Sequence, residues 1–301
     1  MTTDYIGRFA PSPTGPLHIG SLLTAVASYA DAKANQGSWL VRMEDIDPPR
    51  EMSGAADSIL DTLQHYGLHW DGEVCYQSQR QQRYEAAVQQ LIKAQQAFYC
   101  TCSRTQVLAA SGSTTYPGTC RQCHSTPQSP YAIRLLVTDG DIRFHDALQG
   151  NMTYNLKQHS GDFVIKRKEG LYAYHLAVVL DDAEQGVTHV VRGSDLLEST
   201  FSHWHLQTVM GLPHPNYCHL PVIVNHAGQK LSKQTYAEPI PHSNPAPYLL
   251  YCLHALGQHP PQSLNGAPAA TILQWAAEHW RLQSVPHQRA IREQSLQHPA
   301  S

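Results

Sequence analysis

The first 67 residues alternate strand-like and helical segments, and this order limits the possible folds more than any other feature of the sequence. β-favouring residues at 5–9 are followed by a rigid loop at 10–16, which contains three prolines. Apolar side chains then recur at helical spacing up to Asn35. A second strand-like segment at 38–43 leads into a loop at 44–50 and a further helix. This order is typical of a parallel sheet in an α/β fold, and both loops are expected at the edge that binds ligands.

A cysteine-rich segment interrupts this alternation. The spacing of apolar residues predicts a helix over 81–97, and the residues that follow at 99–124 contain glycine, serine, threonine and proline with little periodicity. We interpret them as an insertion that splits the sheet. Segments that restore the α/β pattern follow at 132–137, 142–144, 162–166, 176–180, 187–191 and 219–224.

The composition changes again beyond Glu238. Four prolines break the chain there, and helical patterns follow around 248–256 and 272–282, which predicts a small helical C-terminal region. The expected division of the chain is a first half of the α/β domain at 1–98, an insertion at 99–130, the remainder of the α/β domain at 131–238, and the helical region at 239–301.

The composition excludes several classes of protein. A chain of 301 residues with 42% hydrophobic residues and a net charge of −3 can bury a sizeable core and is not of the disordered type. The nearly neutral charge also argues against a protein that coats nucleic acid, because such binding requires many basic side chains. No stretch approaches the roughly 18 apolar residues of a membrane helix, and the N-terminus does not resemble a signal peptide. We expect a cytoplasmic monomer without a membrane partner.

Two short motifs could handle phosphate groups. His18 and Gly20 lie at the turn into the first expected helix, where free N–H groups and the helix dipole favour an anion. The sequence KLSK places Lys230 and Lys233 after the apolar strand 220–224, and two lysines could stabilise developing phosphate charge. Each motif alone is more often a structural or solvated turn. Both motifs in this order in one α/β chain indicate a nucleotide site.

Blocks of sequence from residue 8 to residue 234 resemble the glutamyl-tRNA synthetases, a group within the class I aminoacyl-tRNA synthetases. HIGS at 18–21 and KLSKQ at 230–234 are similar to the two class I signatures. The other blocks are RFAPSPTG at 8–15, RMEDID at 42–47, AYHLAVVLDD at 173–182 and VVRGSD at 190–195. The resemblance implies a Rossmann-like class I synthetase catalytic core with a zinc-binding insertion and a small C-terminal helical region.

The chain departs from a bacterial glutamyl-tRNA synthetase in two respects. Ser21 stands where the most common form of the first signature has a second histidine. The chain also ends soon after Lys233, whereas that enzyme carries a long C-terminal region that reads the anticodon. The lack of an anticodon-binding domain resembles the glutamyl-queuosine tRNA(Asp) synthetases, a family of shorter paralogues. This resemblance implies ATP-dependent activation of L-glutamate to glutamyl-adenylate, and transfer of the glutamate to the queuosine base in the anticodon loop of tRNA(Asp).

The resemblance also implies which residues form the site. The implied glutamate-binding residues are Arg8, Ser12, Glu44, Tyr174 and Arg192. The implied ATP-binding residues are His18, Gly20 and Lys233, and the implied catalytic residues are His18, Lys230 and Lys233. Glutamate carries one ammonium and two carboxylates, so a site for it needs a fixed cation and a fixed anion, and the arginines and the glutamate in this set supply both. Mg²⁺ is expected to accompany ATP.

The cysteine-rich segment predicts one structural Zn²⁺ per chain. A structural zinc site takes four ligands, and spacing alone favours the four sulfurs of Cys100, Cys102, Cys120 and Cys123. The family resemblance implies instead Cys100, Cys102, Tyr116 and Cys120, with a phenol oxygen as the fourth ligand. We adopt the family's set and keep Cys123 as the alternative. Reduced surface thiols without metal are the remaining interpretation.

Two other functions stay open at this point. A truncated glutamyl-tRNA synthetase would charge a tRNA 3′ end, but a core without an anticodon module has little means of selecting its tRNA. A non-catalytic module would bind tRNA or glutamate, but it has no evident need of His18, Lys230 and Lys233. Transfer to queuosine is therefore the leading prediction.

Overall fold

The N-terminal part of the chain folds as the sequence predicts. The computed structural model describes residues 4–231 and 238–293. The first elements are β1 (Ile6–Phe9), α1 (Ile19–Ala34), β2 (Ser38–Met43) and α2 (Ala55–His65). β1 pairs with β2 in parallel, with Phe9 opposite Val41. The strand–helix–strand–helix order and the parallel sheet are therefore confirmed.

The parallel strands form an array whose order reverses next to β1. β2 also pairs with β3 (Cys75–Tyr76), which gives the order β1-β2-β3. On the other side of β1 lies β9 (His189–Gly193), which contacts β1 and pairs in parallel with β10 (Asn216–Leu220). β10 continues to β6 (Asp141–Asp146), and β6 forms an antiparallel hairpin with β7 (Gly150–Asn155). In sheets of this kind, the gap between the carboxyl ends at the reversal is where ligands bind.

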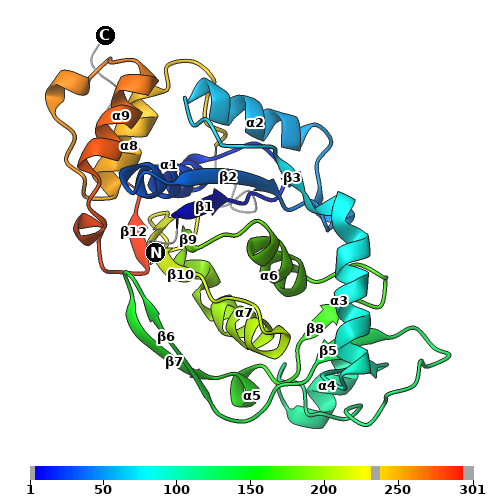
Figure 1. Cartoon of the computed structure of the whole chain (residues 1–301). Helices are drawn as coiled ribbons and strands as arrows, with labels where there is room; N and C mark the ends of the chain where they lie inside the picture. Colours follow the sequence, from blue (N-terminus) through cyan, green and yellow to red (C-terminus); the bar gives the residue numbers. More distant parts are fainter. Residues whose placement is uncertain (1–3, 232–237, 294–301) are drawn as a thin grey trace.

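Two large hydrophobic clusters form most of the described core, and helices and strands both contribute to each. The first joins β1, β2, α1 and α2 to the C-terminal helices α8 (Ala246–Ala255) and α9 (Ala269–His279). The second lies around α3 (Gln81–Lys93), α6 (Tyr174–Glu184) and α7 (Leu197–Met210). Figure 1 shows α8 and α9 beside α1. The C-terminal helices therefore share a core with the sheet. None of the helices within the described ranges has the length and apolar character needed to cross a membrane.

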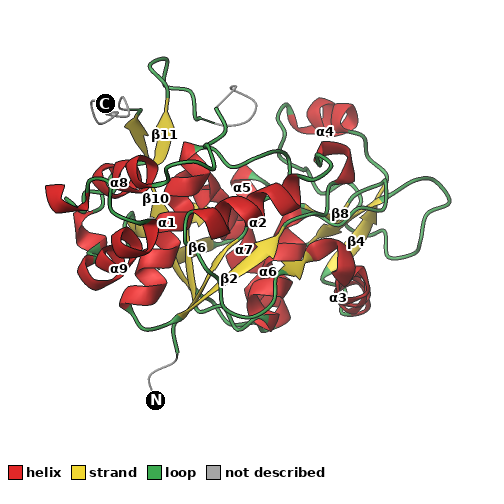
Figure 2. Ribbon diagram, turned by 90° about the horizontal axis from the view of Figure 1, so that it is seen from above, coloured by secondary structure: helices red, strands yellow, loops and turns green. Residues whose placement is uncertain are grey.

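The cysteine-rich region differs from its prediction in two places. The helix expected over 81–97 ends at Lys93, and β4 (Ala97–Cys100) begins a small antiparallel sheet with β5 (Ala132–Leu135) and β8 (Val164–Lys166). All four β4 residues are buried, so the run shows no alternation that would have marked a strand. The segment 99–124 also contains a helix, α4 (Arg104–Ser111), whose capping box joins Ser103 and Gln106. Figure 2 shows α4 and β4 at the opposite end of the molecule from α8 and α9.

The segment expected as one strand at 219–224 is broken at Pro221. Proline cannot donate a ladder hydrogen bond, so β10 ends at Leu220 and β11 (Val222–Val224) begins a separate pair. Its partner is β12 (Ala290–Arg292), which comes from the end of the described chain and runs parallel to β11. Short helical elements complete the described fold: α5 (Leu156–His159) and 3-10 turns at 48–50, 77–80, 194–196, 262–264 and 282–284.

Candidate active site

One pocket lies at the carboxyl ends of β1 and β9, where the strand order reverses. Its volume is about 630 Å³, a size typical of small-molecule sites. The pocket wall gathers eight of the positions that the sequence singled out: Arg8, Ser12, His18, Gly20, Glu44, Tyr174, Arg192 and Lys230. Lys233 lies outside the described residues.

His18 caps helix α1 at the edge of this pocket. Its Nδ1 accepts a hydrogen bond from the backbone N–H of Ser21 at 3.4 Å, and Ser21 Oγ accepts one from the N–H of His18 at 2.9 Å. This reciprocal pair is a capping box, which satisfies two N–H groups at the helix start. Because Nδ1 accepts, the ring proton belongs on Nε2. Ser21, the departure from the common signature, is therefore the structural partner of His18.

The two signature motifs meet at Gly20. A Cβ at this position would lie 3.2 Å from the His18 ring and 3.6 Å from the carbonyl oxygen of Leu231. Glycine therefore lets the start of the lysine-containing loop approach the first motif closely. Lys230, on the same loop, is held by an ion pair of 2.6 Å between its Nζ and Asp195 Oδ2. The pocket thus lies between both motifs.

A buried carboxylate fixes one of the two arginines in the pocket. Asp182, on α6, accepts from Arg8 Nε at 3.2 Å and from Arg42 Nη1 at 2.7 Å. All three side chains are almost completely buried. Burial acts to raise the pKa of Asp182, but Arg42 and Arg8 hold that pKa below its usual range. Arg8 therefore has a carboxylate partner within the protein, which it shares with Arg42.

Glu44 supplies a carboxylate to the same pocket. Its Oε1 lies 3.5 Å from Arg42 Nη2, and its side chain is 8% exposed. Burial raises the pKa of Glu44, although the charges of Arg42 and Arg8 oppose the rise. A further cation brought beside Glu44 would favour its ionised form. The pocket therefore contains a carboxylate suited to an ammonium group.

Arg192 is the second arginine of the pocket, and it is bonded differently from Arg8. Its Nε donates to His219 Nε2 at 3.1 Å, one terminal nitrogen donates to Thr200 Oγ1 at 2.8 Å, and the other donates to the hydroxyl of Tyr174 at 3.2 Å. Burial raises the pKa of Tyr174 to about 12, so this hydroxyl stays neutral. No carboxylate in the described ranges forms an ion pair with Arg192. Its charge is held in the pocket wall by neutral partners.

Sequence reasoning missed several residues that shape the pocket. Asp182 could have been found, because Asp181 and Asp182 place two carboxylates in an otherwise apolar stretch of α6. Asp195 lies inside a matched block, but its contact with Lys230 depends on a loop 35 positions away. His219 has no local signal, because it is one histidine in a buried strand. These roles arise from contacts that only the folded chain creates.

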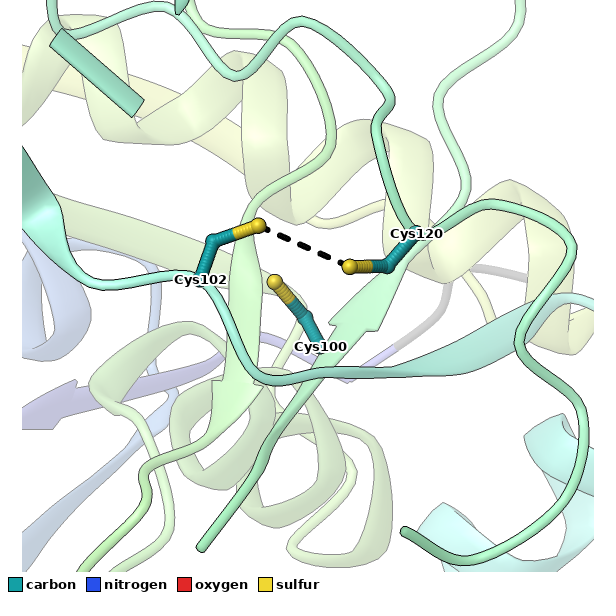
Figure 3. Close-up of side chains that lie close together, drawn as sticks. All are labelled: Cys100, Cys102 and Cys120. Atoms are coloured by element: carbon teal, nitrogen blue, oxygen red, sulfur yellow. Dashed lines mark hydrogen bonds between the residues drawn. The ribbon is translucent and has the colours of Figure 1, made fainter. Parts of the chain in front are cut away.

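The insertion brings three cysteines together. The sulfurs of Cys100, Cys102 and Cys120 lie within 4.8 Å of one another, and this group could hold a metal ion. Figure 3 shows the three side chains converging from β4 and the following loops, with 3.5 Å between the sulfurs of Cys102 and Cys120. The thiol of Cys123 is not part of this group and donates instead to the Ser125 carbonyl at 3.7 Å.

Tyr116 reaches the same cluster with its hydroxyl. The Tyr116 oxygen accepts from the Cys100 thiol at 3.4 Å and from the backbone N–H of Cys120 at 2.8 Å. The backbone of Tyr116 packs against Gly161, whose φ is +66° and where a Cβ would lie 2.5 Å from the Tyr116 carbonyl oxygen. Arg134 lies over the Tyr116 ring at 4.0 Å and donates to the Cys100 sulfur at 3.4 Å. The phenol oxygen of Tyr116 thus lies beside the group of three sulfurs, in contact with Cys100 and Cys120.

Comparison with known proteins identifies the family of this chain. Residues 6–240 match the sequence model described as "tRNA synthetases class I (E and Q), catalytic domain". The chain belongs to this family. The two signature motifs and the pocket between them lie within the matched range, which also includes the insertion.

Relatives in this family match the chain over nearly its full length. The Glutamyl-Q tRNA(Asp) synthetase of Ectopseudomonas mendocina (strain ymp) is 50% identical over 297 residues, which cover 98% of this chain and 100% of the relative. The protein of the same name from Thiobacillus denitrificans is 51% identical and covers 93% of this chain and 95% of the relative. The chain is therefore similar in extent, as well as in sequence, to these synthetases.

Solved structures of family members share the fold. A glutamate-tRNA synthetase from Elizabethkingia anophelis superposes with a TM-score of 0.79 at 26% identity, covering 97% of this chain and 68% of that protein. A glutamate tRNA ligase from Elizabethkingia meningosepticum, solved in complex with its amino acid, has the same TM-score and covers 96% of this chain and 67% of its own. The class I synthetase catalytic fold expected from the sequence is therefore confirmed.

Proposed function

We propose that the chain activates L-glutamate with ATP and transfers the glutamate to the queuosine base in the anticodon loop of tRNA(Asp). The names of the full-length relatives support this substrate pair. The observation that carries the proposal is Arg192, a buried guanidinium on the pocket wall that is held by neutral partners and has no ion pair with a described carboxylate. A buried charge requires a partner, and a carboxylate of glutamate would supply it.

In this proposal the pocket recognises glutamate through its charged groups. Arg192 binds a carboxylate, for which a guanidinium fork is better suited than an ammonium group. Glu44 receives the α-ammonium, whose charge would favour its ionised form. Ser12 and Tyr174 contribute hydroxyls on the same wall, and Arg8 contributes its donor nitrogens while Asp182 holds its position.

The first step joins glutamate to the nucleotide. The α-carboxylate attacks the α-phosphorus of ATP, a carboxyl–phosphate bond forms, and the bond to the β-phosphate breaks to release pyrophosphate. His18, Gly20 and the first turn of α1 would bind the phosphates through N–H donors. Lys233, with Lys230 beside it, would stabilise the charge that develops, and Mg²⁺ would arrive with ATP. In the second step a hydroxyl of queuosine attacks the carbonyl carbon, and AMP leaves.

We also propose that the insertion binds one structural Zn²⁺ through Cys100, Cys102, Tyr116 and Cys120. The convergence of three sulfurs and the phenol oxygen supports this set over the set with Cys123. Bound zinc would cross-link the loops around α4 and contribute folding free energy. It would lie apart from the pocket and take no part in the chemistry.

The setting follows from the substrates. ATP, glutamate and tRNA occur together in the cytoplasm, and we place the chain there. We propose that the protein is a monomer. Sedimentation of the purified protein tests the oligomeric state.

The first test measures activation without tRNA. Glutamate-dependent exchange of pyrophosphate into ATP should require only the protein, Mg²⁺ and the two substrates. Lys233→Ala should lower the rate about 100-fold, as expected for the loss of one charge-stabilising donor. An exchange that depends wholly on added tRNA would contradict this part of the proposal.

The second test locates the acceptor. Labelled glutamate and ATP are incubated with tRNA(Asp) that contains or lacks queuosine, and the labelled tRNA is then digested and mapped. Label in the anticodon fragment of queuosine-containing tRNA alone is the expected result. Label at the 3′ end would identify a truncated glutamyl-tRNA synthetase, and no label would identify a non-catalytic module.

A further inference from the structure

Three buried side chains form a chain of hydrogen bonds across three neighbouring strands. Asp146 ends β6, His219 lies in β10 and Arg192 lies in β9, and the sheet order places β10 between the other two. His219 is opposite Arg192 in the register of β9 and β10. Asp146 and His219 have no exposed surface, and Arg192 is 3% exposed. This series of hydrogen bonds therefore runs through the core and ends at the pocket.

The hydrogen bonds have a defined direction. His219 Nδ1 lies 2.6 Å from Asp146 Oδ2, and His219 Nε2 lies 3.1 Å from Arg192 Nε. A carboxylate can only accept, so the imidazole proton is on Nδ1, and Nε2 is left to accept the Nε–H of Arg192. Burial lowers the pKa of His219 to about 4, which keeps the ring neutral near pH 7. The ring thus transmits orientation without adding a charge.

The carboxylate at the far end is itself fixed. Asp146 Oδ1 accepts the backbone N–H groups of Leu148, Gln149 and His219 at 3.1, 2.8 and 3.2 Å. Because Asp146 is held in place, its Oδ2 fixes the position of the imidazole. The imidazole in turn fixes the plane of the Arg192 guanidinium.

We infer that Asp146 and His219 are positioning residues that orient Arg192 to bind a carboxylate of glutamate, and this inference rests on the proposed function. The contrast with Arg8 gives the physical reason. Arg8 contacts the carboxylate of Asp182 directly, so its guanidinium already has an anionic partner in the protein. The imidazole of His219 keeps Asp146 one ring away from Arg192, so the guanidinium is fixed in place while its charge remains available to a substrate.

Asp146→Asn tests the direction of these hydrogen bonds and leaves the shape of the side chain almost unchanged. The amide oxygen can still accept the three backbone N–H groups, but the amide nitrogen replaces Oδ2 and donates to Nδ1. The ring proton must then move to Nε2, where it opposes the Nε–H of Arg192. The KM for glutamate should rise about 10- to 100-fold, as expected for the loss of a charge-assisted hydrogen bond, while the KM for ATP changes by less than about threefold.

Two substitutions of His219 separate its hydrogen bond to Asp146 from its hydrogen bond to Arg192. His219→Gln places a carboxamide near the position of Nε2 and can still accept from Arg192, whereas His219→Asn places one near Nδ1 and can still donate to Asp146. Glutamate binding should therefore weaken more in His219→Asn than in His219→Gln. The affinities of both variants for glutamate and, separately, for ATP are measured by titration calorimetry. Equal glutamate affinities in the two variants would overturn the inference, including when Asp146→Asn does not fold.

A matched control distinguishes positioning from stability. Asp162 is another fully buried aspartate, and it accepts from Arg121 at 2.6 and 2.7 Å, outside the pocket wall. Asp162→Asn should lower the melting temperature and leave both KM values unchanged. If the wild type shows no glutamate-dependent exchange, the proposed function fails. If the wild type is active and Asp146→Asn keeps the wild-type KM for glutamate, the positioning inference alone fails.

Discussion

Arg8 donates through Nε to the carboxylate of Asp182 at 3.2 Å, and this contact separates the two arginines of the pocket. Arg42 donates to the same oxygen at 2.7 Å, so two guanidinium groups share one buried carboxylate. Arg192 has no such partner among the described residues. In the proposed function, Asp182 therefore holds Arg8 in position, and the charge of Arg192 is directed to glutamate.

Substitution of Arg192 should therefore affect one substrate only. Arg192→Ala should weaken glutamate binding about 100-fold, because a buried charged hydrogen bond is lost, and should change ATP binding little. Arg192→Lys should not restore the affinity, because an ammonium group cannot contact His219, Thr200 and a carboxylate in one plane. Titration calorimetry with each ligand measures both effects. An equal loss of affinity for the two ligands would mean that Arg192 supports the fold.

Local patterns were sufficient to predict the loops around the pocket. The break at 10–16 and the helix start at His18 follow from proline placement and capping, which act within a few residues. The parallel pairing of β1 and β2 follows from the helix between them. Both loops, after β1 and after β2, were therefore expected at the carboxyl ends of these strands, and residues of both line the pocket.

Contacts between distant segments were not predictable in this way. Asp146 and His219 are 73 positions apart, and nothing near either residue indicates the other. The predicted end of α3 was also wrong, because alanine and glutamine at 94–96 are good helix formers and the buried residues 97–100 show no polar alternation. Gln95, with a φ of 55°, breaks the helix there, and a glutamine gives no signal for that conformation.

The ligand set in the insertion can be decided by substitution. Tyr116→Phe removes the phenol oxygen that lies 3.4 Å from Cys100 Sγ, whereas Cys123→Ser changes a thiol outside the cluster. Metal content should fall in Tyr116→Phe and in Cys100→Ala, and Cys123→Ser should retain one Zn²⁺ per chain. Elemental analysis of the purified proteins measures this.

Removal of the metal ion by a chelator should affect the stability of the protein before it affects catalysis. A structural ion contributes folding free energy, so its removal should lower the melting temperature before it lowers pyrophosphate exchange. Full metal in Tyr116→Phe together with its loss in Cys123→Ser would establish the four-sulfur set. A wild-type protein without metal would contradict both sets.

The histidines around Arg192 should make the fold sensitive to mild acid. Burial lowers the pKa of His175 and of His219 to about 4, and it lowers the pKa of His203 well below its usual range. The unfolded chain binds these protons near pH 6.5, so each group stabilises the fold above that pH, and the contribution is lost as pH falls toward 4. The free energy of unfolding should fall by about 1.4 kcal/mol per pH unit for each histidine.

Denaturant titrations between pH 6.5 and 5 measure this slope. His175→Phe keeps an aromatic ring beside Phe163 and removes one titrating group. Its slope should be lower by about one proton than that of the wild type. An identical slope would show that His175 is not neutral in the folded protein.

The last strand of the described chain should matter for nucleotide use. The carbonyl of Arg289 accepts from Val222 N–H at 3.0 Å and from Ser194 Oγ at 2.5 Å, and Glu293 N–H donates to Val224 at 2.8 Å. β12 thereby holds β11, the strand that leads into the Lys230 loop. A chain truncated after Gln288 should lose these bonds and melt ~5 °C lower, and its KM for ATP should rise more than its KM for glutamate. A chain truncated after Glu293 keeps the strand and is the control. If both truncations preserve the KM for ATP, the loop does not depend on β12.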